Sequence, residues 1–544
     1  MGIGWGEWGD AAFARGRALG KPILLSLTAR WCHACHRMDE ETWEHPGVAA
    51  LVERATVPVR VDADARPDVY GRYHLGGLPT TALLAADGGF MRGGTFLSPP
   101  QFFAFLEAAL ADFGSGRRPP RRPSLPSPAA PETIVDEMIM RLLRRADAEH
   151  GGFGAGPKRP EIHALPLLLR RWRVSRDASI ARVVRGALDA IVEHLADPRD
   201  GGFFRYAAAA DWTGLHTEKV AVDQAQVIRL LLEAGSALGE PRYLELARQG
   251  LAHARRRLAD DAGRVFASVA ADAPYYAGAR RADELPAVDR RRFADSSAAM
   301  VSAAWLGFAV SGDPPAFQAE FRAAAPAGSV PHRLDEPEGP YGLLQDQAMV
   351  IDATLVEYRL SGDPGLVPWA ERAASFCIEH LWDESTGAFR SARDDGDPVR
   401  LPPIFPLVAN GELACGLIDL AAHANCPKYL SYAERVVRSL SPQALGSPAG
   451  PAVALAAQRL EDRAAAADLV GDPGDARARD LARVVITALG PTAVIRWRGG
   501  ADPRVTLCVG DLCLPPVGDP RELSRSLMDL GLATGGILDG PRSQ

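Results

Sequence analysis

The sequence predicts a chain of several domains: an N-terminal α/β domain, a long all-helical region and a small α/β segment at the C-terminus. Length is the first reason, because 544 residues exceed the roughly 250–300 residues at which a single hydrophobic core stops growing. The second reason is that short apolar runs alternate with helical patterns through residues 21–113. The third is that repeated helical patterns fill most of the chain beyond residue 131.

Composition excludes several classes of function. The chain has 47% hydrophobic and 24% charged residues and a formal net charge of -7, so no nucleic-acid partner is expected. No apolar stretch reaches the length that a membrane helix needs, and the N-terminus lacks the pattern of a secretory signal. Seven cysteines do not form a disulfide framework in a chain of this size. We therefore expect a cytoplasmic protein with no membrane partner.

The N-terminal domain combines strands and helices in a definite order. Residues 21–27 and residues 57–62 are short apolar runs, which predicts two strands. Pro79 precedes a third strand, and a turn at Asp87-Gly88 leads to a fourth that starts at Phe90. Helices are predicted over residues 33–51, with Pro46 as a point where the helix could break, and over residues 101–113. The predicted order is βαβ(α)ββα.

The pentapeptide Cys32-His33-Ala34-Cys35-His36 follows the first strand. Two cysteines with this spacing and a following histidine occur in three kinds of site: c-type haem attachment, zinc binding and a redox dithiol. Haem attachment requires export, for which the chain shows no signal. Zinc normally requires a second ligand pair at suitable spacing, and none lies nearby. The redox dithiol is therefore the favoured interpretation, and we expect no cofactor and no metal.

The strand-to-helix junction also favours a dithiol. Cys32 is expected at the N-cap of the helix and Cys35 in its first turn. A thiol at a helix N-terminus faces the positive end of the helix dipole, which favours the thiolate and lowers the pKa of the thiol. Protonated His33 and His36 would strengthen this effect. We expect the sulfur of Cys32 to be exposed and that of Cys35 not to be.

The stretch KPILLSLTARWCHACHRMDEETWE resembles the thioredoxin-like domain of the spermatogenesis-associated protein 20 family. It carries that family's Cys-His-x-Cys-His motif, with Ala34 in place of a tryptophan. A glycine-rich family segment corresponds to residues 76–80, which are shorter here. The resemblance implies a thioredoxin-like fold for residues 1–113, with Pro79 as the cis-proline that lies beside the dithiol in such folds.

The dithiol interpretation gives each residue a role. Cys32 attacks a disulfide, Cys35 resolves the mixed disulfide, and Pro79 shapes the binding groove. His33 and His36 tune the thiolate. The expected partners are protein or small-molecule thiols and disulfides.

Residues 114–131 are rich in proline and arginine, which predicts an extended linker. Beyond them, Gly239-Glu240-Pro241, Gly312-Asp313-Pro314 and Gly362-Asp363-Pro364 each combine a helix-ending glycine with a residue pair that opens the next helix. A solenoid could stack such helix pairs. The available length fits better with a closed ring of inner and outer helices, an (α/α)6 toroid over residues 132–485.

The family resemblance continues through HGGFGAGPKRP and HTEKVAVDQAQVIRL, and implies a toroid like those of six-hairpin glycosidases and N-acylglucosamine 2-epimerases. Such toroids carry catalytic groups where the inner helices start. The candidates for a substrate cavity are His216, Glu218, Lys219, Asp223, Asp346, Trp212 and Phe153, with Phe203 and Phe389 as further aromatic walls. For Asp223, Asp295 and Asp346 taken singly, the better explanation is that each caps an inner helix, whereas capping does not explain the His216-Glu218-Lys219 cluster.

Three functions stay open at this point. The first is a thiol-disulfide oxidoreductase domain fused to a toroid with a sugar-like ligand. The second is a sugar-active enzyme, an epimerase or a glycosidase, in which the toroid does the chemistry. The third is a non-enzymatic binding protein.

The segment 486–544 reads as short strands followed by a helix from residue 520 to 532. A two-residue hairpin turn at Gly510-Asp511 would set Cys508 opposite Cys513. Facing cysteines in a non-hydrogen-bonded pair have close Cβ atoms, so they can form a disulfide or remain two thiols.

Overall fold

The computed structural model describes residues 2–116, 134–281, 283–337, 339–393, 401–462, 465–509 and 512–532. The chain divides into two compact units. The first is built from residues 1–126, 270–289 and 390–406, and the second from residues 127–269, 290–389 and 407–544. The two later segments of the first unit lie, in sequence, inside the region predicted to form the toroid. Most of the predicted linker falls outside the described residues.

The first unit contains a four-stranded sheet in the order β2-β1-β3-β4. Its strands are β1 (Ile23–Thr28), β2 (Val57–Asp62), β3 (Thr80–Leu84) and β4 (Phe90–Gly94). β1 is parallel to β2 and antiparallel to β3, which is in turn antiparallel to β4. Five of the six residues of the central strand β1 are buried, which explains its continuous apolar run. The four predicted strands are confirmed.

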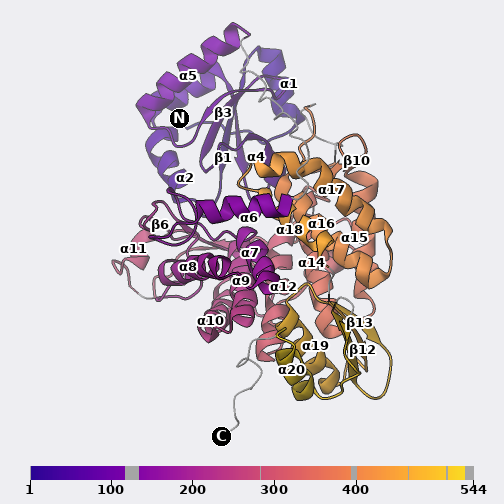
Figure 1. Cartoon of the computed structure of the whole chain (residues 1–544). Helices are drawn as coiled ribbons and strands as arrows, with labels where there is room; N and C mark the ends of the chain where they lie inside the picture. Colours follow the sequence, from indigo (N-terminus) through magenta and orange to yellow (C-terminus); the bar gives the residue numbers. More distant parts are fainter. Residues whose placement is uncertain are drawn as a thin grey trace. The chain divides into compact units, whose positions relative to one another are not determined.

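Helices cover both faces of this sheet. The helical elements are α1 (Asp10–Leu19), α2 (His33–Met38), the π-helix η1 (Asp39–Trp43), α3 (Pro46–Ala55), α4 (Pro67–Tyr73) and α5 (Pro99–Gly114). One face packs against Phe13 of α1 and Tyr73 of α4, and the other against Val52 of α3 and Phe102 of α5. In Figure 1 the strands β1 and β3 lie between α1 and α5.

The predicted long helix over residues 33–51 is interrupted. After six residues α2 widens into the π-helix η1, and Pro46 then begins α3. The side chain of His45 caps α3 by accepting a hydrogen bond from Val48 N. Proline lacks an N–H and fits the first turn of a helix, which explains the restart at Pro46. α1 was not predicted from the sequence.

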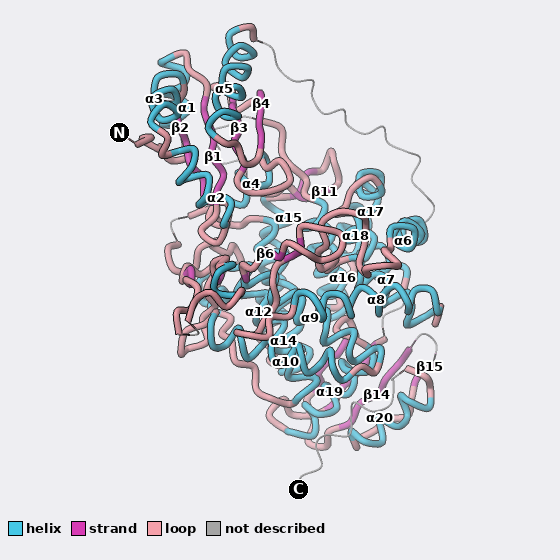
Figure 2. Tube along the Cα trace, turned by 90° about the vertical axis from the view of Figure 1, so that its left-hand side faces the viewer, coloured by secondary structure: helices cyan, strands magenta, loops and turns pink. Residues whose placement is uncertain are grey.

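Six inner helices of the second unit close into a ring. They are α7 (Ala164–Ser175), α9 (Ala221–Leu238), α12 (Ala294–Ser311), α14 (Leu344–Ser361), α16 (Leu407–Ala424) and α18 (Gly450–Glu461). Each packs against the next in this order, and α18 packs against α7. Figure 2 shows how far helices, in cyan, dominate this unit. The (α/α)6 toroid is confirmed by the closure of the ring.

An outer layer surrounds the ring. Its helices are α6 (Ile134–Arg145), α8 (Ala178–Leu195), α10 (Pro241–Arg257), α13 (Glu320–Ala324), α15 (Leu366–His380) and α17 (Lys428–Leu445). Gly239 ends α9 in the left-handed conformation, with φ 68°, and Pro241 begins α10, as the sequence predicts. No helix starts at Pro314, since residues 312–319 have no regular secondary structure and the next helix is α13.

Short two-residue strands fill the loops between the helices of the second unit. They are β5 (Tyr206–Ala207), β6 (Leu215–His216), β7 (Lys219–Val220), β8 (Ser268–Val269), β10 (Trp382–Asp383) and β11 (Ala388–Phe389). Three of these loops contain glycine-aromatic turns, in which an aromatic residue closely follows a glycine: Gly151-Gly152-Phe153, Gly201-Gly202-Phe203 and Gly387-Ala388-Phe389. Inner-helix amides anchor two of them. Gln224 exchanges hydrogen bonds of 2.8 and 2.6 Å with the backbone of Phe203. Asn410 does the same at Phe389, at 2.8 and 2.9 Å.

The C-terminal part of the second unit is a small α/β fold. It comprises β12 (Ala466–Val470), α19 (Ala476–Leu489), β13 (Val494–Arg498), β14 (Arg504–Val509), β15 (Leu512–Cys513) and α20 (Pro520–Asp529). The sheet order β13-β12-β14-β15, with β12 parallel to β13 and the other pairs antiparallel, repeats that of the N-terminal sheet. The predicted strands and final helix are present, and the sheet begins at β12, ahead of residue 486.

Within the described ranges, no helix combines the length and apolar character required to cross a membrane.

Candidate functional site

The cysteine pair lies at the end of β1, where Cys32 is the N-cap of α2. Cys32 and Cys35 form a disulfide, and Cys35 N donates a hydrogen bond of 3.2 Å to Cys32 Sγ. The N–H of Cys35 therefore contacts the sulfur of Cys32 directly. Since α2 is only six residues long, this local hydrogen bond matters more for the sulfur than the dipole of a long helix would. The strand-to-helix junction predicted from the sequence is therefore present.

Both cysteines of the oxidised pair are buried. Cys32 is 4% exposed and Cys35 is 2% exposed, whereas His33 and His36 are exposed. The expectation that Cys32 alone would be exposed is not met in this state, because the disulfide holds both sulfurs within the first turn of α2. The two histidines lie on the solvent side of the motif.

Hydrogen bonds within the first unit hold Trp31, the residue directly before the motif. The Leu78–Pro79 peptide bond, directly before β3, is cis, as the family resemblance implies. Trp31 Nε1 donates to Asp64 Oδ2 at 2.9 Å, which fixes the indole before Cys32. Trp31 O accepts a hydrogen bond of 3.3 Å from Ala271 N. A segment far along the chain therefore contacts the residue that precedes Cys32, a contact that no local sequence pattern could reveal.

Part of the predicted toroid site forms a real cluster. His216 Nδ1 lies 3.6 Å from Glu218 Oε1, and Arg205 Nη1 lies 3.8 Å from the same oxygen. Arg205 Nε also donates to Asp223 Oδ2 at 2.9 Å. The ring of Tyr206 stacks on His216 with centroids 3.9 Å apart. The sequence missed Arg205, which links the two carboxylates.

Lys219 does not belong to this cluster. Its side chain is fully buried, and its Nζ donates to Asp197 Oδ2 at 2.6 Å. Burial is the largest influence and lowers the pKa of Lys219, while Asp197 opposes that change. Lys219 therefore stabilises the turn that contains Asp197 through this salt bridge, and its ammonium group does not face a ligand.

The predicted aromatic walls are core residues. Trp212 is 3% exposed and donates from Nε1 to His150 O at 2.8 Å. Phe153, Phe203 and Phe389 are at most 5% exposed. These rings pack beneath the glycine-aromatic turns, so they offer no open surface on which a sugar could stack.

Asp346 belongs to a different group, with His332 and Asp295. His332 Nδ1 lies 3.0 and 2.9 Å from the two carboxylate oxygens of Asp346, and one ligand atom from each of the three residues lies within 4.8 Å of the others. His332 and Asp346 are 1% exposed, and Asp295 is half-buried. Burial, followed by the charge of Asp346, raises the pKa of Asp295, and His332 opposes them.

The capping interpretation of the three aspartates is wrong. The N-cap residues of α9, α12 and α14 are Val220, Phe293 and Leu343, and none provides a side-chain cap. Asp223, Asp295 and Asp346 are instead the second or third residues of their helices. Their carboxylates are therefore available for side-chain partners, while still facing the positive helix ends.

The ring encloses a cavity of about 170 Å³ that all six inner helices line. Its polar lining residues are His163, Arg170, Gln226, Arg229, Glu233, Asp352, Arg359, Glu412, Asp419, Arg459 and Thr492. The lining contains none of the cavity residues predicted from the sequence and no Phe, Tyr or Trp among the described residues. The cavity is charged rather than aromatic.

Most charges around this cavity are paired. Arg229 Nη1 donates to Asp352 Oδ2 at 2.6 Å, and His163 Nε2 lies 3.0 Å from Glu412 Oε1. Burial is the largest influence on Glu233 and raises its pKa, against the attraction of nearby arginines. A small ligand in the cavity would therefore meet alternating acids and bases.

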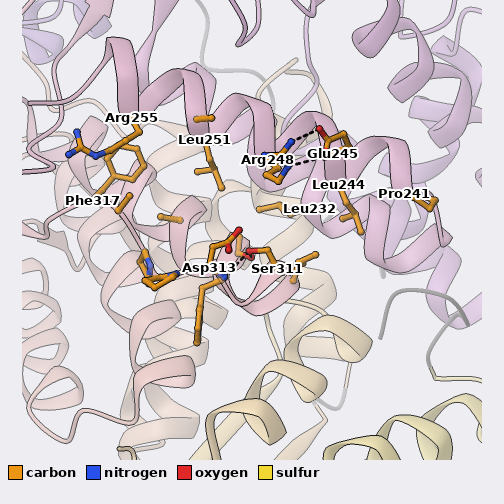
Figure 3. A pocket seen from close by; sticks show the side chains of 18 residues that line it. Leu232, Pro241, Leu244, Glu245, Arg248, Leu251, Arg255, Ser311, Asp313 and Phe317 are labelled. Atoms are coloured by element: carbon orange, nitrogen blue, oxygen red, sulfur yellow. Dashed lines mark hydrogen bonds and ion pairs between the residues drawn. The ribbon is translucent and has the colours of Figure 1, made fainter. Parts of the chain in front are cut away.

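An apolar groove of about 630 Å³ lies on the outer layer (Figure 3). Leu244 and Leu251 of α10 line it on one side, and Ser311, Asp313 and Phe317 line it on the other. The groove exists because α13, the outer helix that follows α12, has only five residues and leaves part of α12 uncovered. It is separate from the ring cavity.

A second disulfide joins Cys508 on β14 to Cys513 on β15. The two residues face each other in the sheet, and Leu514 N donates to Leu507 O at 2.8 Å in the adjacent pair. Hydrogen-bonded and non-hydrogen-bonded pairs alternate in antiparallel sheets, so the cysteines occupy a non-hydrogen-bonded pair, as predicted. The predicted turn residues Gly510 and Asp511 lie outside the described residues.

The comparisons with known proteins agree with this architecture. The Thioredox_DsbH family model, described as a protein of unknown function, DUF255, matches residues 1–107. Human spermatogenesis-associated protein 20 is 28% identical over 325 residues, which cover 51% of this chain and 40% of that protein. The thiol:disulfide interchange protein DsbD of Cronobacter sakazakii is 32% identical over 107 residues, 19% of each chain.

Among solved structures, the cellobiose 2-epimerase of Spirochaeta thermophila is similar, with a TM-score of 0.46 and 19% identity over 56% of this chain and 82% of that one. The matched region covers about two fifths of the length of the first curated relatives. The chain is thus similar to spermatogenesis-associated protein 20 over about half its length, and its residues 1–107 match the Thioredox_DsbH family model.

Proposed function

We propose that the N-terminal unit catalyses thiol-disulfide exchange, with Cys32 as the nucleophile and Cys35 as the resolving cysteine. The observation that carries the proposal is the Cys32–Cys35 disulfide in the first turn after β1, in a unit whose cis-proline precedes β3. The DsbD relative, named as a thiol:disulfide interchange protein and 32% identical over 107 residues, supports it. The partners are protein or small-molecule thiols and disulfides.

The reaction begins from the reduced dithiol. The Cys32 thiolate attacks one sulfur of a substrate disulfide, the substrate S–S bond breaks, and a mixed disulfide and a substrate thiolate result. The Cys35 thiolate then attacks Cys32 Sγ, which releases the second substrate thiolate and closes the Cys32–Cys35 disulfide. The substrate gains two electrons and the protein loses two. The N–H of Cys35 supports the Cys32 thiolate by a hydrogen bond.

Selective alkylation of the reduced protein tests the assignment. Because Cys32 accepts the hydrogen bond, we expect it to react with iodoacetamide with a midpoint below the free-cysteine pKa of about 8.5. Cys35 should react more slowly throughout. Peptide mapping by mass spectrometry across pH measures both rates, with the buried Cys377 as an internal unreactive control. Equal rates for Cys32 and Cys35, or a Cys32 midpoint near 8.5, would refute the assignment.

A second candidate function is the binding of a sugar-like ligand in the ring cavity. The specific observation is its lining of paired planar donors and acceptors, including Arg229 with Asp352 and His163 with Glu412. Such groups suit the adjacent hydroxyls of a polyhydroxylated molecule. The lack of an aromatic wall in the described lining favours a small ligand bound by hydrogen bonds instead of by stacking.

A thermal-shift screen of mono- and oligosaccharides tests this candidate. A true ligand at saturating concentration should raise the Tm by on the order of 5 °C, and Glu412→Gln should reduce that shift. Glu384→Gln, at an exposed position away from the cavity, should leave it unchanged. If no sugar shifts the Tm, or if the shift survives in Glu412→Gln, the ligand assignment fails.

A cytoplasmic location for either activity stays a prediction from the sequence.

A further inference from the structure

We propose that Asp295, His332 and Asp346 form a binding site for a divalent cation at the start of α12 and α14, with Mn²⁺ or Fe²⁺ as the fitting class of metal. The site is independent of the dithiol and of the ring cavity. None of its three residues lines that cavity, and none is part of the His216 cluster.

The geometry suits direct coordination. Two ligands placed at right angles on a metal, each about 2.1 Å from it, lie about 3 Å apart. His332 Nδ1 lies 3.0 and 2.9 Å from the oxygens of Asp346. Ligand atoms of all three residues fall within 4.8 Å of one another. A metal between them therefore needs only small side-chain rotations, with no rearrangement of the helices.

The backbone holds the three residues from separate elements. Asp295 and Asp346 sit in the first turns of α12 and α14, which are neighbours in the ring. His332 comes from the loop before α14, and its backbone is tied on both sides. Ala294 N donates to His332 O, and His332 N donates to Pro340 O, each at 2.9 Å. Preorganised ligands on rigid elements are what a metal site requires.

The charges also favour a cation. Two carboxylates and one imidazole gather within 4.8 Å of one another, and a divalent cation between them would offset the repulsion of the two carboxylates.

The donor set narrows the class of metal. Two carboxylates and one imidazole suit first-row metals such as Mn²⁺ and Fe²⁺ better than Mg²⁺ or Ca²⁺, which prefer oxygen ligands throughout. His332 and Asp346 are buried and Asp295 is half-buried. The remaining coordination positions therefore lie on the side of Asp295, where water or a ligand oxygen can reach the metal.

Titration of the full-length, oxidised protein with MnCl₂ tests the proposal. Loss of the free Mn²⁺ signal in electron paramagnetic resonance measures binding, and Mn²⁺ has little affinity for the cysteine sulfurs. We expect one Mn²⁺ per chain, with affinity reduced at least about tenfold in Asp295→Asn and in His332→Gln. Pulsed spectra of the wild type should show ¹⁴N coupling from His332, and this coupling should vanish in His332→Gln.

Asp223→Asn is the matched control, because Asp223 occupies the same helical position in α9 as Asp346 in α14 but pairs with Arg205. It should bind Mn²⁺ within twofold of the wild type. Circular dichroism establishes that each variant is folded, and the half-buried Asp295→Asn is the variant least able to disturb packing. No Mn²⁺ binding at millimolar concentration, or equal binding by Asp295→Asn and wild type, would show a hydrogen-bonded triad without a metal and overturn the proposal.

Discussion

Replacing Cys32 by serine is expected to lower the disulfide-reductase rate of the protein by at least about a thousandfold. The hydroxyl of serine is not ionised at neutral pH, and an alkoxide cannot form the mixed disulfide through which exchange proceeds. Reduction of a small aromatic disulfide, driven by excess dithiothreitol and corrected for the uncatalysed reaction, measures the rate.

Cys35→Ser should have a different effect. Its first half-reaction stays possible, so a mixed disulfide at Cys32 should accumulate and be visible by intact-protein mass spectrometry. Glu41→Gln is the control, since it removes only an exposed ion pair with Arg37, outside the dithiol, and its rate should stay close to that of the wild type. A Cys32→Ser variant that keeps its rate while Cys35→Ser loses it would reverse the roles of the two cysteines.

The dithiol could be predicted because its determinants are local. A buried apolar strand, a cysteine at the next helix N-cap and a second cysteine three residues later lie within residues 23–38. The buried state of Cys32 could not be predicted in the same way. It depends on the disulfide with Cys35 and on packing in the first unit, where Ala271, more than two hundred positions away, donates a hydrogen bond to the neighbouring Trp31.

The ring was predictable for a related reason. Each helix end carries local chemistry, such as the left-handed Gly239 followed by Pro241 at the start of α10. Because these helix-end signals repeat along the chain, they predict the number of helix pairs. That number of pairs in turn predicts a closed ring. Where the chain departs from it, as at Pro314, the outer helix is short and the apolar groove appears.

The toroid site was only partly visible. His216, Glu218 and Asp223 were found because they lie close together in sequence, and the structure joins them through Arg205. His332 was missed because the loop that carries it shows no periodic pattern. The expectation of no metal was argued from the cysteine motif alone, and the imidazole of His332 did not enter that argument. The sequence did contain a pattern that indicates the ring cavity. The polar residues Gln226, Arg229 and Glu233 lie on one face of α9, a helix that is otherwise largely apolar.

The second large effect is expected at Asp419, which lines the ring cavity. Asp419 is 4% exposed and forms salt bridges with both Arg359 of α14 and Arg459 of α18. Burial by itself disfavours the charged carboxylate, but the two guanidinium groups together outweigh it and lower the pKa of Asp419 to about 2. One carboxylate therefore balances two buried arginines on different inner helices.

Asp419→Asn should lower the free energy of unfolding of the second unit by about 3–5 kcal/mol, because removing one partner leaves buried charge uncompensated. Urea unfolding followed by far-UV circular dichroism, which is dominated by the helices, measures the loss. Asp468→Asn is the matched control. It removes an ion pair with Arg498 whose side chains are 43% and 62% exposed, and exposed pairs contribute at most about 1 kcal/mol.

The pH dependence separates this ionic effect from a packing defect. The folded pKa of Asp419 lies below its ordinary value of 3.8, so its charge stabilises the fold above about pH 4, and this contribution is lost as the pH falls through about 2. The difference in stability between wild type and Asp419→Asn should therefore be constant above pH 4 and shrink between pH 4 and pH 2. A difference that stays the same at low pH would assign the loss to packing of the amide, because protonation of Asp419 would then have no effect on the wild type.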